Sequence, residues 1–278
     1  MLDWHKLDSH QQRLLTGAAL TVPLVAVLAA GPYWMIAAIV GLASVAGLWE
    51  LHRMLFAEPL GRSWQALYLA IGLSLPVGAF LGGFQGLHAA LVGAIFSGLL
   101  ALLFFSPLDP AGLSRLARFS LSWLYVPYLL SYALLIALQA EGARWLLFIF
   151  AVIATDDIAA FYCGGRFGRH KLYPTVSPKK TIEGSLGGLL GSLAIGTLYG
   201  SIWLSAASTC QIVLLSAVLG VAGQVADLFE SMIKRSSGRK DSSSLLPGHG
   251  GILDRLDSLL FAFPVTFFFV TWSRPELL

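Results

Sequence analysis

The stretch Leu87–Phe105, LHAALVGAIFSGLLALLFF, contains no Asp, Glu, Lys or Arg. A helix rises 1.5 Å per residue, so a helix of this length crosses the roughly 30 Å hydrocarbon core of a bilayer. The run is too long for a barrel strand and does not alternate between apolar and polar residues. Working outward, 56% of the 278 residues are apolar, 12% are charged, and the mean hydropathy is +0.75. This composition predicts an all-α, polytopic integral membrane protein and excludes a soluble globular core.

Apolar runs close to the length of one bilayer crossing recur along the chain. They occupy residues 14–30, 33–49, 66–84, 87–105, 119–139, 145–162, 186–204, 209–229 and 256–272. We therefore predict about nine transmembrane helices.

The distribution of positive charge predicts the orientation of these helices. If the N-terminus is cytoplasmic, every Lys and Arg except Arg144 and Arg274 falls in an inner segment. Cytoplasmic loops of membrane proteins carry such an excess of Lys and Arg. We therefore expect the C-terminus outside and the two large basic loops in the cytoplasm. A short chain without targeting extensions also suits a bacterial inner membrane.

The two halves of the chain differ in polar content. Residues 1–140 predict a helical scaffold with thin connections, and we interpret Glu50, His52 and Arg53 there as ordinary interfacial charges. Residues 141–278 predict the catalytic region, because polar groups gather at the inner ends of its helices. Cys163 and Cys210 lie at opposite membrane levels and outside any CxxC pair, so neither a disulfide nor a zinc site is expected.

One polar cluster is TDDIAAFYCGGRFGRHKLYPTVSPKKTIEG, residues 155–184. Asp156 and Asp157 fall within an apolar helix, where an ionisable group is costly unless it faces a partner or water. The loop that follows is rich in glycine and in basic residues, which can bind phosphate through backbone N–H groups and ammonium contacts. Candidate substrate-binding residues are Asp156, Ser177, Lys179, Lys180 and Thr181. The alternative is an ordinary basic loop against anionic lipids.

The second cluster is KRSSGRKDSSSLLPGHGGILDRLDS, Lys234 to Ser258, together with the helix end that precedes it. Asp227, Glu230 and Lys234 are spaced by three and four residues and share one helix face, where Glu230 and Lys234 can form an ion pair. Asp254 and Asp257 lie one turn apart at the start of the last apolar run. Carboxylates at helix ends suit Mg²⁺, which takes one or two of them together with substrate phosphates and water. The pattern therefore favours a metal-bound nucleotide at the membrane surface.

The same residues resemble the phosphatidate cytidylyltransferases, also called CDP-diglyceride synthases. The matching elements are Ser231-x-x-Lys234-Arg235, Lys240-Asp241, Pro247-Gly-His-Gly-Gly251 and Asp254-Arg255-x-Asp257. The first cluster is similar to that family's other recurring region, so the resemblance covers about the last 130 residues. Departures are Asp157, where many members carry a smaller residue, and Ile182, where Trp is frequent.

The resemblance implies transfer of a cytidylyl group from CTP to phosphatidate, giving CDP-diacylglycerol and pyrophosphate, with Mg²⁺ required and a second metal ion left open. The phosphate of phosphatidate is already an anionic nucleophile, so no strong protein base is expected. We predict Asp227, Asp254 and Asp257 as metal ligands, and Asp227, Asp254, Lys234 and Arg255 as the catalytic set. Further contacts to phosphate are predicted for Arg235, Lys240 and His249. The family also implies a homodimer, and no nucleic acid partner is expected.

Two alternatives stay open from the residues. A related CTP-dependent membrane transferase or kinase with another lipid acceptor would carry a similar nucleotide site. A cation-coupled transporter would instead place its acids near the bilayer midplane with access from both sides. The clustering of the acids at one face disfavours the transporter.

Overall fold

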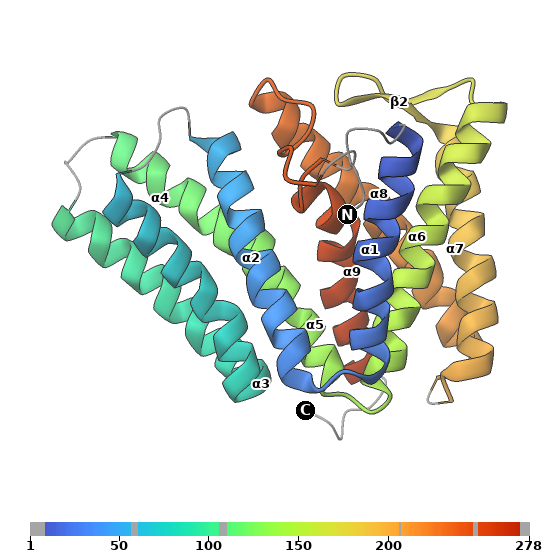
Figure 1. Cartoon of the computed structure of the whole chain (residues 1–278), viewed down its shortest axis with the longest axis horizontal. Coiled ribbons are helices and arrows are strands. Elements are labelled where there is room, and N and C mark those ends of the chain that lie inside the picture. The colour runs from blue at the N-terminus through green and yellow to red at the C-terminus, as the bar shows by residue number, and fades with distance from the viewer. Residues whose placement is uncertain (1–8, 57–60, 106–109, 206, 247–249, 273–278) are drawn as a thin grey trace. The chain divides into compact units, whose positions relative to one another are not determined.

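The structure is a computed structural model that describes residues 9–56, 61–105, 110–205, 207–246 and 250–272. Its helices and strands, in chain order (Figure 1), are α1 (Ser9–Ala30), α2 (Tyr33–Leu55), α3 (Arg62–Phe105), α4 (Pro110–Trp123), the π-helical turn η2 (Leu124–Tyr128), α5 (Leu129–Ala137), α6 (Gly142–Phe167), β1 (Lys171–Tyr173), β2 (Ser177–Thr181), α7 (Ile182–Trp203), α8 (Thr209–Ser236) and α9 (Leu253–Trp272). The predicted all-α class is confirmed, with one small antiparallel hairpin added.

Six of the described helices are long and apolar enough to cross a membrane. They are α2, α3, α6, α7, α8 and the continuous helix Gly112–Ala137. The predicted count of about nine is not confirmed. Within the part of α1 whose side chains the structure describes, Thr21–Ala30 forms a short apolar helix. The first turns of α9 contain Asp254, Arg255 and Asp257, which dilute its apolar content.

The long element α3 is not one straight helix, because it reverses direction at Gly83, and its two arms correspond to the predicted runs 66–84 and 87–105. Gly83 has φ 57° and ψ −139°, a conformation that glycine adopts without steric cost. A Cβ added to Gly78 would lie 2.5 Å from the carbonyl oxygen of Gly86, although residues eight apart in a straight helix are about 12 Å apart. The two arms of α3 therefore pack closely, and glycine at these positions permits it.

The chain divides into two compact units. The N-terminal unit comprises Met1–Leu135 and Asp241–Arg255, and the C-terminal unit comprises Ile136–Lys240 and Leu256–Leu278. The first predicted region, residues 1–140, ends close to the first of these boundaries. The segment Asp241–Arg255, however, belongs with the N-terminal helices although it lies more than a hundred residues later in the sequence.

Large aromatic side chains form the core of the N-terminal unit. Tyr68 and Trp123 are fully buried, and the indole N–H of Trp123 donates to the carbonyl oxygen of Tyr68 at 2.9 Å. The Tyr68 hydroxyl donates to the carbonyl oxygen of Leu48 at 3.2 Å. These contacts join α2, α3 and α4, and each polar atom of the pair is satisfied within an apolar core.

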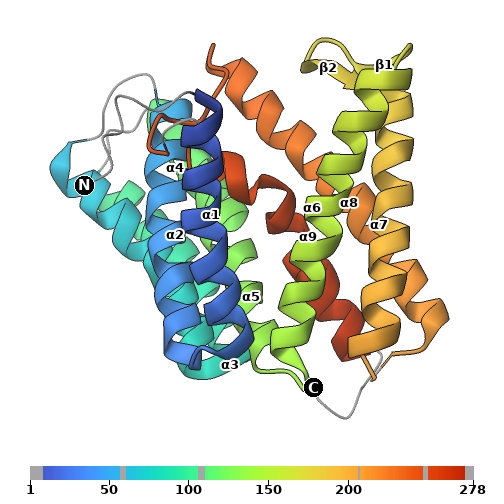
Figure 2. The ribbon, with the colours of Figure 1, turned by 45° about the vertical axis from the view of Figure 1, so that its right-hand side comes forward.

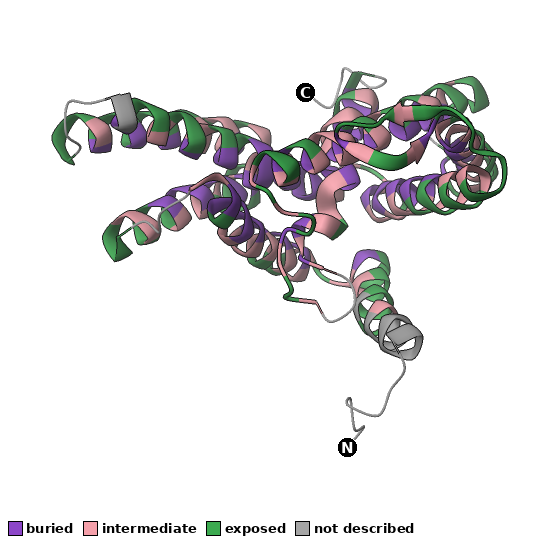
Figure 3. Cartoon of the chain, turned by 90° about the horizontal axis from the view of Figure 1, so that it is seen from above, coloured by how far each residue is buried: buried purple, intermediate pink, exposed green. Residues whose placement is uncertain are grey.

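Small residues let the helices of the C-terminal unit approach one another. In α7 the residues at every fourth position are buried, namely Gly184, Gly188, Ser192, Gly196 and Gly200. Such small residues allow close packing of helices in membranes, where apolar surface alone does not drive association. Buried and exposed residues follow one another along the ribbons (purple and green in Figure 3). The spacing of four places the small residues on one face of α7.

Helix caps and the hairpin define the ends of α7 and α8. Thr181 caps α7 by accepting the N–H of Gly184 at 3.1 Å, and Ser208 and Gln211 form a capping box at the start of α8. The hairpin of β1 and β2 lies at the end of α6 and the start of α7 (Figure 2). The loop between α6 and α7 is therefore ordered by strand pairing rather than being irregular.

The orientation of the helices in the membrane gives a testable prediction. The hairpin and Cys210 lie at opposite ends of α7, whose 22 residues span about 33 Å. With Cys163→Ser as background, we expect the exposed thiol of Cys210 to react with an impermeant maleimide in intact cells. A cysteine introduced at the exposed Tyr173, in a chain that also carries Cys210→Ser, should react only after permeabilisation. The reverse labelling pattern would contradict the predicted orientation.

Candidate functional site

The C-terminal unit gathers acidic and basic side chains from α6, α8, α9 and the hairpin. The carboxyl of Asp257 interacts electrostatically with Asp227, Asp157 and Lys234. Lys180 Nζ lies 2.5 Å from Asp227 Oδ2, and both side chains are about one quarter exposed. Four predicted residues therefore lie in one cluster with Asp157. We call these five residues, Asp157, Lys180, Asp227, Lys234 and Asp257, the acidic cluster.

Helix packing explains why these residues meet. A Cβ on Gly223 of α8 would lie 2.7 Å from Ile153 Cδ1 of α6 and 3.5 Å from Ser258 Cβ of α9. Glycine at position 223 therefore lets the three helices converge one turn away from Asp227. Asp157, Asp227 and Asp257 lie within about one turn of these contacts on the same three helices, so the packing of the helices brings the acids together.

Asp156 is buried and links three helices through its own hydrogen bonds. Its side chain accepts Ser192 Oγ at 3.0 Å and Gln224 Nε2 at 3.0 and 3.2 Å. Gln224 also donates to the carbonyl oxygen of Ser185 at 3.0 Å. The predicted substrate-binding residue Asp156 therefore has two polar protein partners, and its substrate contact stays a prediction. Ser192 and Gln224 are polar residues of long apolar runs, which is the signal that could have identified them.

The close approach at Asp156 predicts a difference between two glycines. A Cβ on Gly188 would lie 2.9 Å from Asp156 Oδ1 and 3.0 Å from its backbone oxygen, whereas a Cβ on Gly165 meets nothing within 4 Å. We expect Gly188→Ala to destabilise the protein by about 1–3 kcal/mol through overpacking. Gly165→Ala should be neutral or slightly stabilising, because alanine favours the helix. Thermal unfolding of both variants in detergent checks this, and equal midpoints would contradict the packing seen at Gly188.

Other predicted site residues have defined structural partners. Thr181 is the cap of α7, and Lys234 pairs with the fully buried Glu230, as predicted for these two residues. Arg235 Nε donates to the carbonyl oxygen of Val176 at 3.2 Å and so ties the hairpin to α8. Ser177 lies at the start of β2, and Lys179, Lys240 and Arg255 are exposed. His249 lies outside the described residues.

Asp254 is held by the segment that precedes it. Its Oδ2 accepts the N–H groups of Ser242 at 3.0 Å and Gly251 at 2.8 Å, and lies 2.8 Å from Ser242 Oγ. Gly250 has φ 78°, and a Cβ there would lie 2.5 Å from the same oxygen. Gly250 and Gly251 therefore let the chain fold tightly around Asp254. Asp227 and Asp254 belong to different units, and their joint role as metal ligands stays a prediction.

Glu50 is a functional candidate that the sequence interpretation missed. It is fully buried, and its carboxylate contacts Ser242, Ser243, Ile252 and Leu253, so the interpretation of Glu50 as an interfacial charge is wrong. His52 is also buried, whereas Arg53 is exposed. An acid at the inner end of an apolar run was the available signal. Its partners, about 200 residues away in the sequence, gave none.

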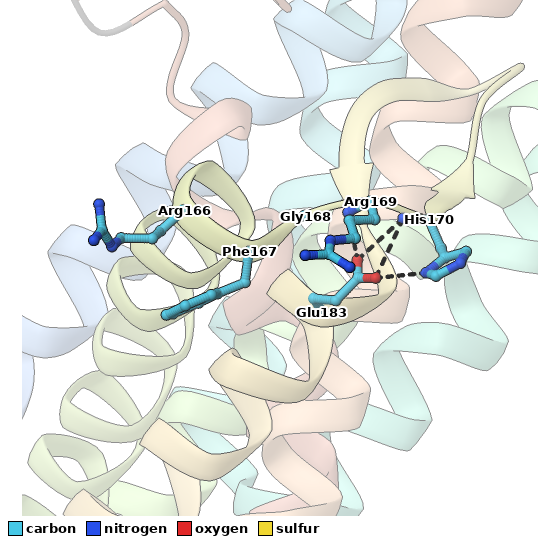
Figure 4. Close-up of a pocket in the computed structure, with 6 residues that line it drawn as sticks. All are labelled: Arg166, Phe167, Gly168, Arg169, His170 and Glu183. Carbon is cyan, nitrogen blue, oxygen red and sulfur yellow. Dashed lines mark hydrogen bonds and ion pairs between the residues drawn. The ribbon is translucent and has the colours of Figure 1, made fainter.

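A surface pocket of about 450 Å³ lies beside the hairpin and contains none of the predicted site residues. Glu183 accepts the backbone N–H of Arg169 at 3.0 Å and lies 2.6 Å from His170 Nδ1 (Figure 4). Arg166 points away from this group in the same view. These contacts fix the turn between α6 and β1. The carboxylates predicted to bind a metal lie in the acidic cluster and do not line this pocket.

The donor set fits Mg²⁺ bound with a nucleotide rather than held by protein alone. Within the described residues, no three His, Cys, Asp or Glu side chains are arranged to hold a metal ion by themselves. The acidic cluster nevertheless brings together several carboxylates and two ammonium groups. Mg²⁺ usually keeps water and takes one or two carboxylates plus substrate phosphates. The residues therefore fit the metal only in the presence of a phosphate ligand.

Comparison with known proteins agrees with the resemblance drawn from the motifs. A model of the cytidylyltransferase family matches residues 11–273. The chain belongs to this cytidylyltransferase family. It is 33% identical to the uncharacterized protein YnbB of Escherichia coli (strain K12) over 251 residues, which cover 87% of this chain and 81% of that protein.

Curated phosphatidate cytidylyltransferases match a shorter part of the chain. Identity is 43% over 134 residues with that of Staphylococcus epidermidis (strain RP62A) and 41% over 134 residues with that of Staphylococcus aureus (strain COL). Each alignment covers 46% of this chain and 49% of the relative, so the chain matches about half of the length of these enzymes. The family member is thus a membrane nucleotidyltransferase with bacterial relatives, which indicates a bacterial membrane.

Proposed function

We propose that this protein transfers the cytidylyl group of CTP to the phosphate of phosphatidate, forming CDP-diacylglycerol and pyrophosphate. The observation that carries the proposal is the acidic cluster of a cytidylyltransferase family member, where Asp157, Asp227 and Asp257 lie with Lys180 and Lys234. Carboxylates and ammonium groups in one cluster are suited to bind a metal-bound triphosphate. The names of the Staphylococcus relatives support phosphatidate as the acceptor.

The reaction balances without a protein base. A phosphate oxygen of phosphatidate forms a bond to the α-phosphorus of CTP, and the bond from that phosphorus to the bridging oxygen of the β-phosphate breaks. Pyrophosphate leaves with the bonding electron pair. The attacking oxygen is already anionic, so positioning and charge neutralisation are the main requirements.

The chain's own residues divide these tasks. Asp227 and Asp257, with Asp254, are the proposed ligands of Mg²⁺, which when bound neutralises phosphate charge and orients the phosphates. Lys180 exchanges its contact with Asp227 for a phosphate oxygen of the nucleotide. Lys179, Lys240 and Arg255 are exposed and are proposed to contact further phosphate oxygens. Because CTP is supplied from the cytoplasm, the proposed site faces that side. The homodimer implied by the family stays a prediction.

A panel of acceptors tests the proposed substrate. Purified protein in detergent receives labelled CTP and Mg²⁺ with phosphatidate, diacylglycerol or a polyprenyl phosphate. We expect a labelled lipid with phosphatidate only, chromatographing as CDP-diacylglycerol. Label in another acceptor would identify a related CTP-dependent transferase or kinase and reject phosphatidate as the substrate.

A further inference from the structure

Both carboxylate oxygens of Glu50 contact the motif segment, defined here as Ser242, Ser243 and residues 250–253 of the same unit. Oε1 lies 2.6 Å from Ser243 Oγ and 2.9 Å from the backbone nitrogen of Ile252. Oε2 lies 3.0 Å from Ser242 Oγ and 2.8 Å from the backbone nitrogen of Leu253. The carboxylate therefore accepts two backbone N–H groups and has two serine hydroxyls within hydrogen-bond distance, although the single proton of the Ser242 hydroxyl goes to either Glu50 or Asp254 at one time.

The position of Glu50 fits a negative charge in a buried place. Leu253 is the first residue of α9, so the N–H groups of Ile252 and Leu253 lie at the helix N-terminus, where the helix dipole favours an anion. Hydrogen bonds to a charged acceptor are stronger than those between neutral groups. Burial of the carboxylate without such donors would be costly. The donors of Ser242, Ser243, Ile252 and Leu253 thus satisfy the buried carboxylate of Glu50 within the unit.

The segment is shaped to receive this carboxylate. A Cβ on Gly251 would lie 2.6 Å from Glu50 Oε2 and would also collide with Ser242 Oγ. Any residue larger than glycine at this position would therefore displace Glu50 or the serine. The close approach of Glu50 therefore requires glycine at position 251, and the close approach of Asp254 requires glycine at position 250.

Ser242 connects Glu50 to Asp254. Its hydroxyl lies 3.0 Å from Glu50 Oε2 and 2.8 Å from Asp254 Oδ2, and its backbone N–H donates to the same Asp254 oxygen at 3.0 Å. Ser242 is fully buried, so water does not compete for these bonds. Glu50 thus fixes Ser242 and the start of α9, and both of these fix the carboxylate of Asp254.

We propose that Glu50 is a positioning residue that holds Ser242, Ser243 and residues 250–253 and thereby sets the orientation of Asp254 for the metal-bound nucleotide. This inference rests on the proposed function. Glu50 touches no substrate in this role and acts through Ser242 and the start of α9. The first half of the chain therefore contributes to the positioning of Asp254 within the N-terminal unit, although it carries none of the predicted site residues.

Residue-resolved amide hydrogen exchange tests the proposal without an activity readout. The amides of Ile252 and Leu253 report the bonds to Glu50, and those of Ser242 and Gly251 report the bonds to Asp254. Glutamine offers one acceptor oxygen where glutamate offers two, so two donors lose their acceptor in Glu50→Gln. We expect exchange to accelerate at least tenfold at both pairs of amides. Acceleration at Ile252 and Leu253 alone would overturn the positioning of Asp254.

The dependence of the rate on Mg²⁺ gives a second readout. In Glu50→Gln we expect the Mg²⁺ concentration for half-maximal liponucleotide formation to rise at least tenfold, because Asp254 is no longer held in place. Loss of folded protein alone would lower the maximal rate without moving this concentration. An unchanged half-maximal concentration together with unchanged exchange would overturn the inference while leaving the proposed function intact.

Matched variants separate positioning from general damage. Ser44→Ala removes another fully buried polar group of α2, whose Oγ donates to its own helix at Val40 O, and should change neither readout. Ser243→Ala removes one donor and should shift both readouts in the same direction as Glu50→Gln but by less, which keeps the test available if Glu50→Gln does not fold. The proposal would be contradicted if Ser243→Ala changed neither amide exchange nor the half-maximal Mg²⁺ concentration. It would also be contradicted if Ser44→Ala changed both as much as Glu50→Gln does. A wild-type protein that forms no liponucleotide would reject the proposed function, and exchange would still decide the role of Glu50.

Discussion

Asp227→Asn is expected to lower the turnover of CTP and phosphatidate by roughly a hundred- to a thousandfold. Loss of about 3 to 4 kcal/mol of transition-state stabilisation produces this change. The amide keeps the size of the side chain and an acceptor for Ser231 Oγ, which lies 3.3 Å from Oδ1. It removes the charge that is proposed to bind the metal and that pairs with Lys180. Liponucleotide formation by the purified variant measures the effect.

Folding should be nearly unaffected in Asp227→Asn, which separates the catalytic role from a structural one. A partly exposed ion pair contributes about 1 kcal/mol or less. Glu141→Gln is the matched control, because it also removes a carboxylate that pairs with a basic residue, Arg144 at 2.6 Å. The neighbouring Glu230 is unsuitable for this purpose, since it is fully buried. Turnover of Asp227→Asn within a few fold of the control would reject the metal role.

The second large effect is expected at Asp254, where asparagine and alanine should differ. Asparagine retains one oxygen that can accept the N–H groups of Ser242 and Gly251, whereas alanine retains none. We expect turnover to fall by roughly a hundred- to a thousandfold in both variants, through loss of about 3 to 4 kcal/mol of transition-state stabilisation. Amide protection of the motif segment should survive in Asp254→Asn and be lost in Asp254→Ala.

Two results would contradict this account of Asp254. Wild-type turnover in Asp254→Asn would show that its charge is not needed and would leave only a structural role. Full amide protection in Asp254→Ala would show that Asp254 does not hold the segment. Measuring turnover and exchange on the same preparations distinguishes the two roles.

Much of the fold could be predicted because membrane insertion constrains the sequence strongly. Runs such as Leu87–Phe105 must be apolar throughout their length, and the described helices follow these runs. The number of membrane-spanning helices was harder to predict. The break between runs 66–84 and 87–105 was predicted and coincides with the reversal at Gly83, whereas the acids in the first turns of α9 make its apolar run ambiguous.

The grouping of charged residues could be predicted where they are close in the sequence or lie at adjoining helix ends, and their role in binding substrate or metal stays a prediction. Asp227 and Asp257 share a cluster with Lys180 and Lys234, and these residues stood out as charges in an apolar chain. Contacts over long sequence separations could not be predicted. Glu50 meets Ile252 and Leu253 about 200 residues away, and no local pattern records that pairing. Thr181 illustrates a different limit, since a cap and a ligand-binding threonine look alike in sequence.

The most direct test of the central claim follows the two ends of the triphosphate. Wild-type protein in detergent is incubated with Mg²⁺ and phosphatidate, and with CTP labelled at either the α- or the γ-phosphorus. The account predicts that the α-label enters the lipid, that the γ-label appears in pyrophosphate, and that the two products form in equal amounts. Transfer of the γ-label to the lipid would identify a kinase, and absence of both products would contradict cytidylyl transfer to phosphatidate.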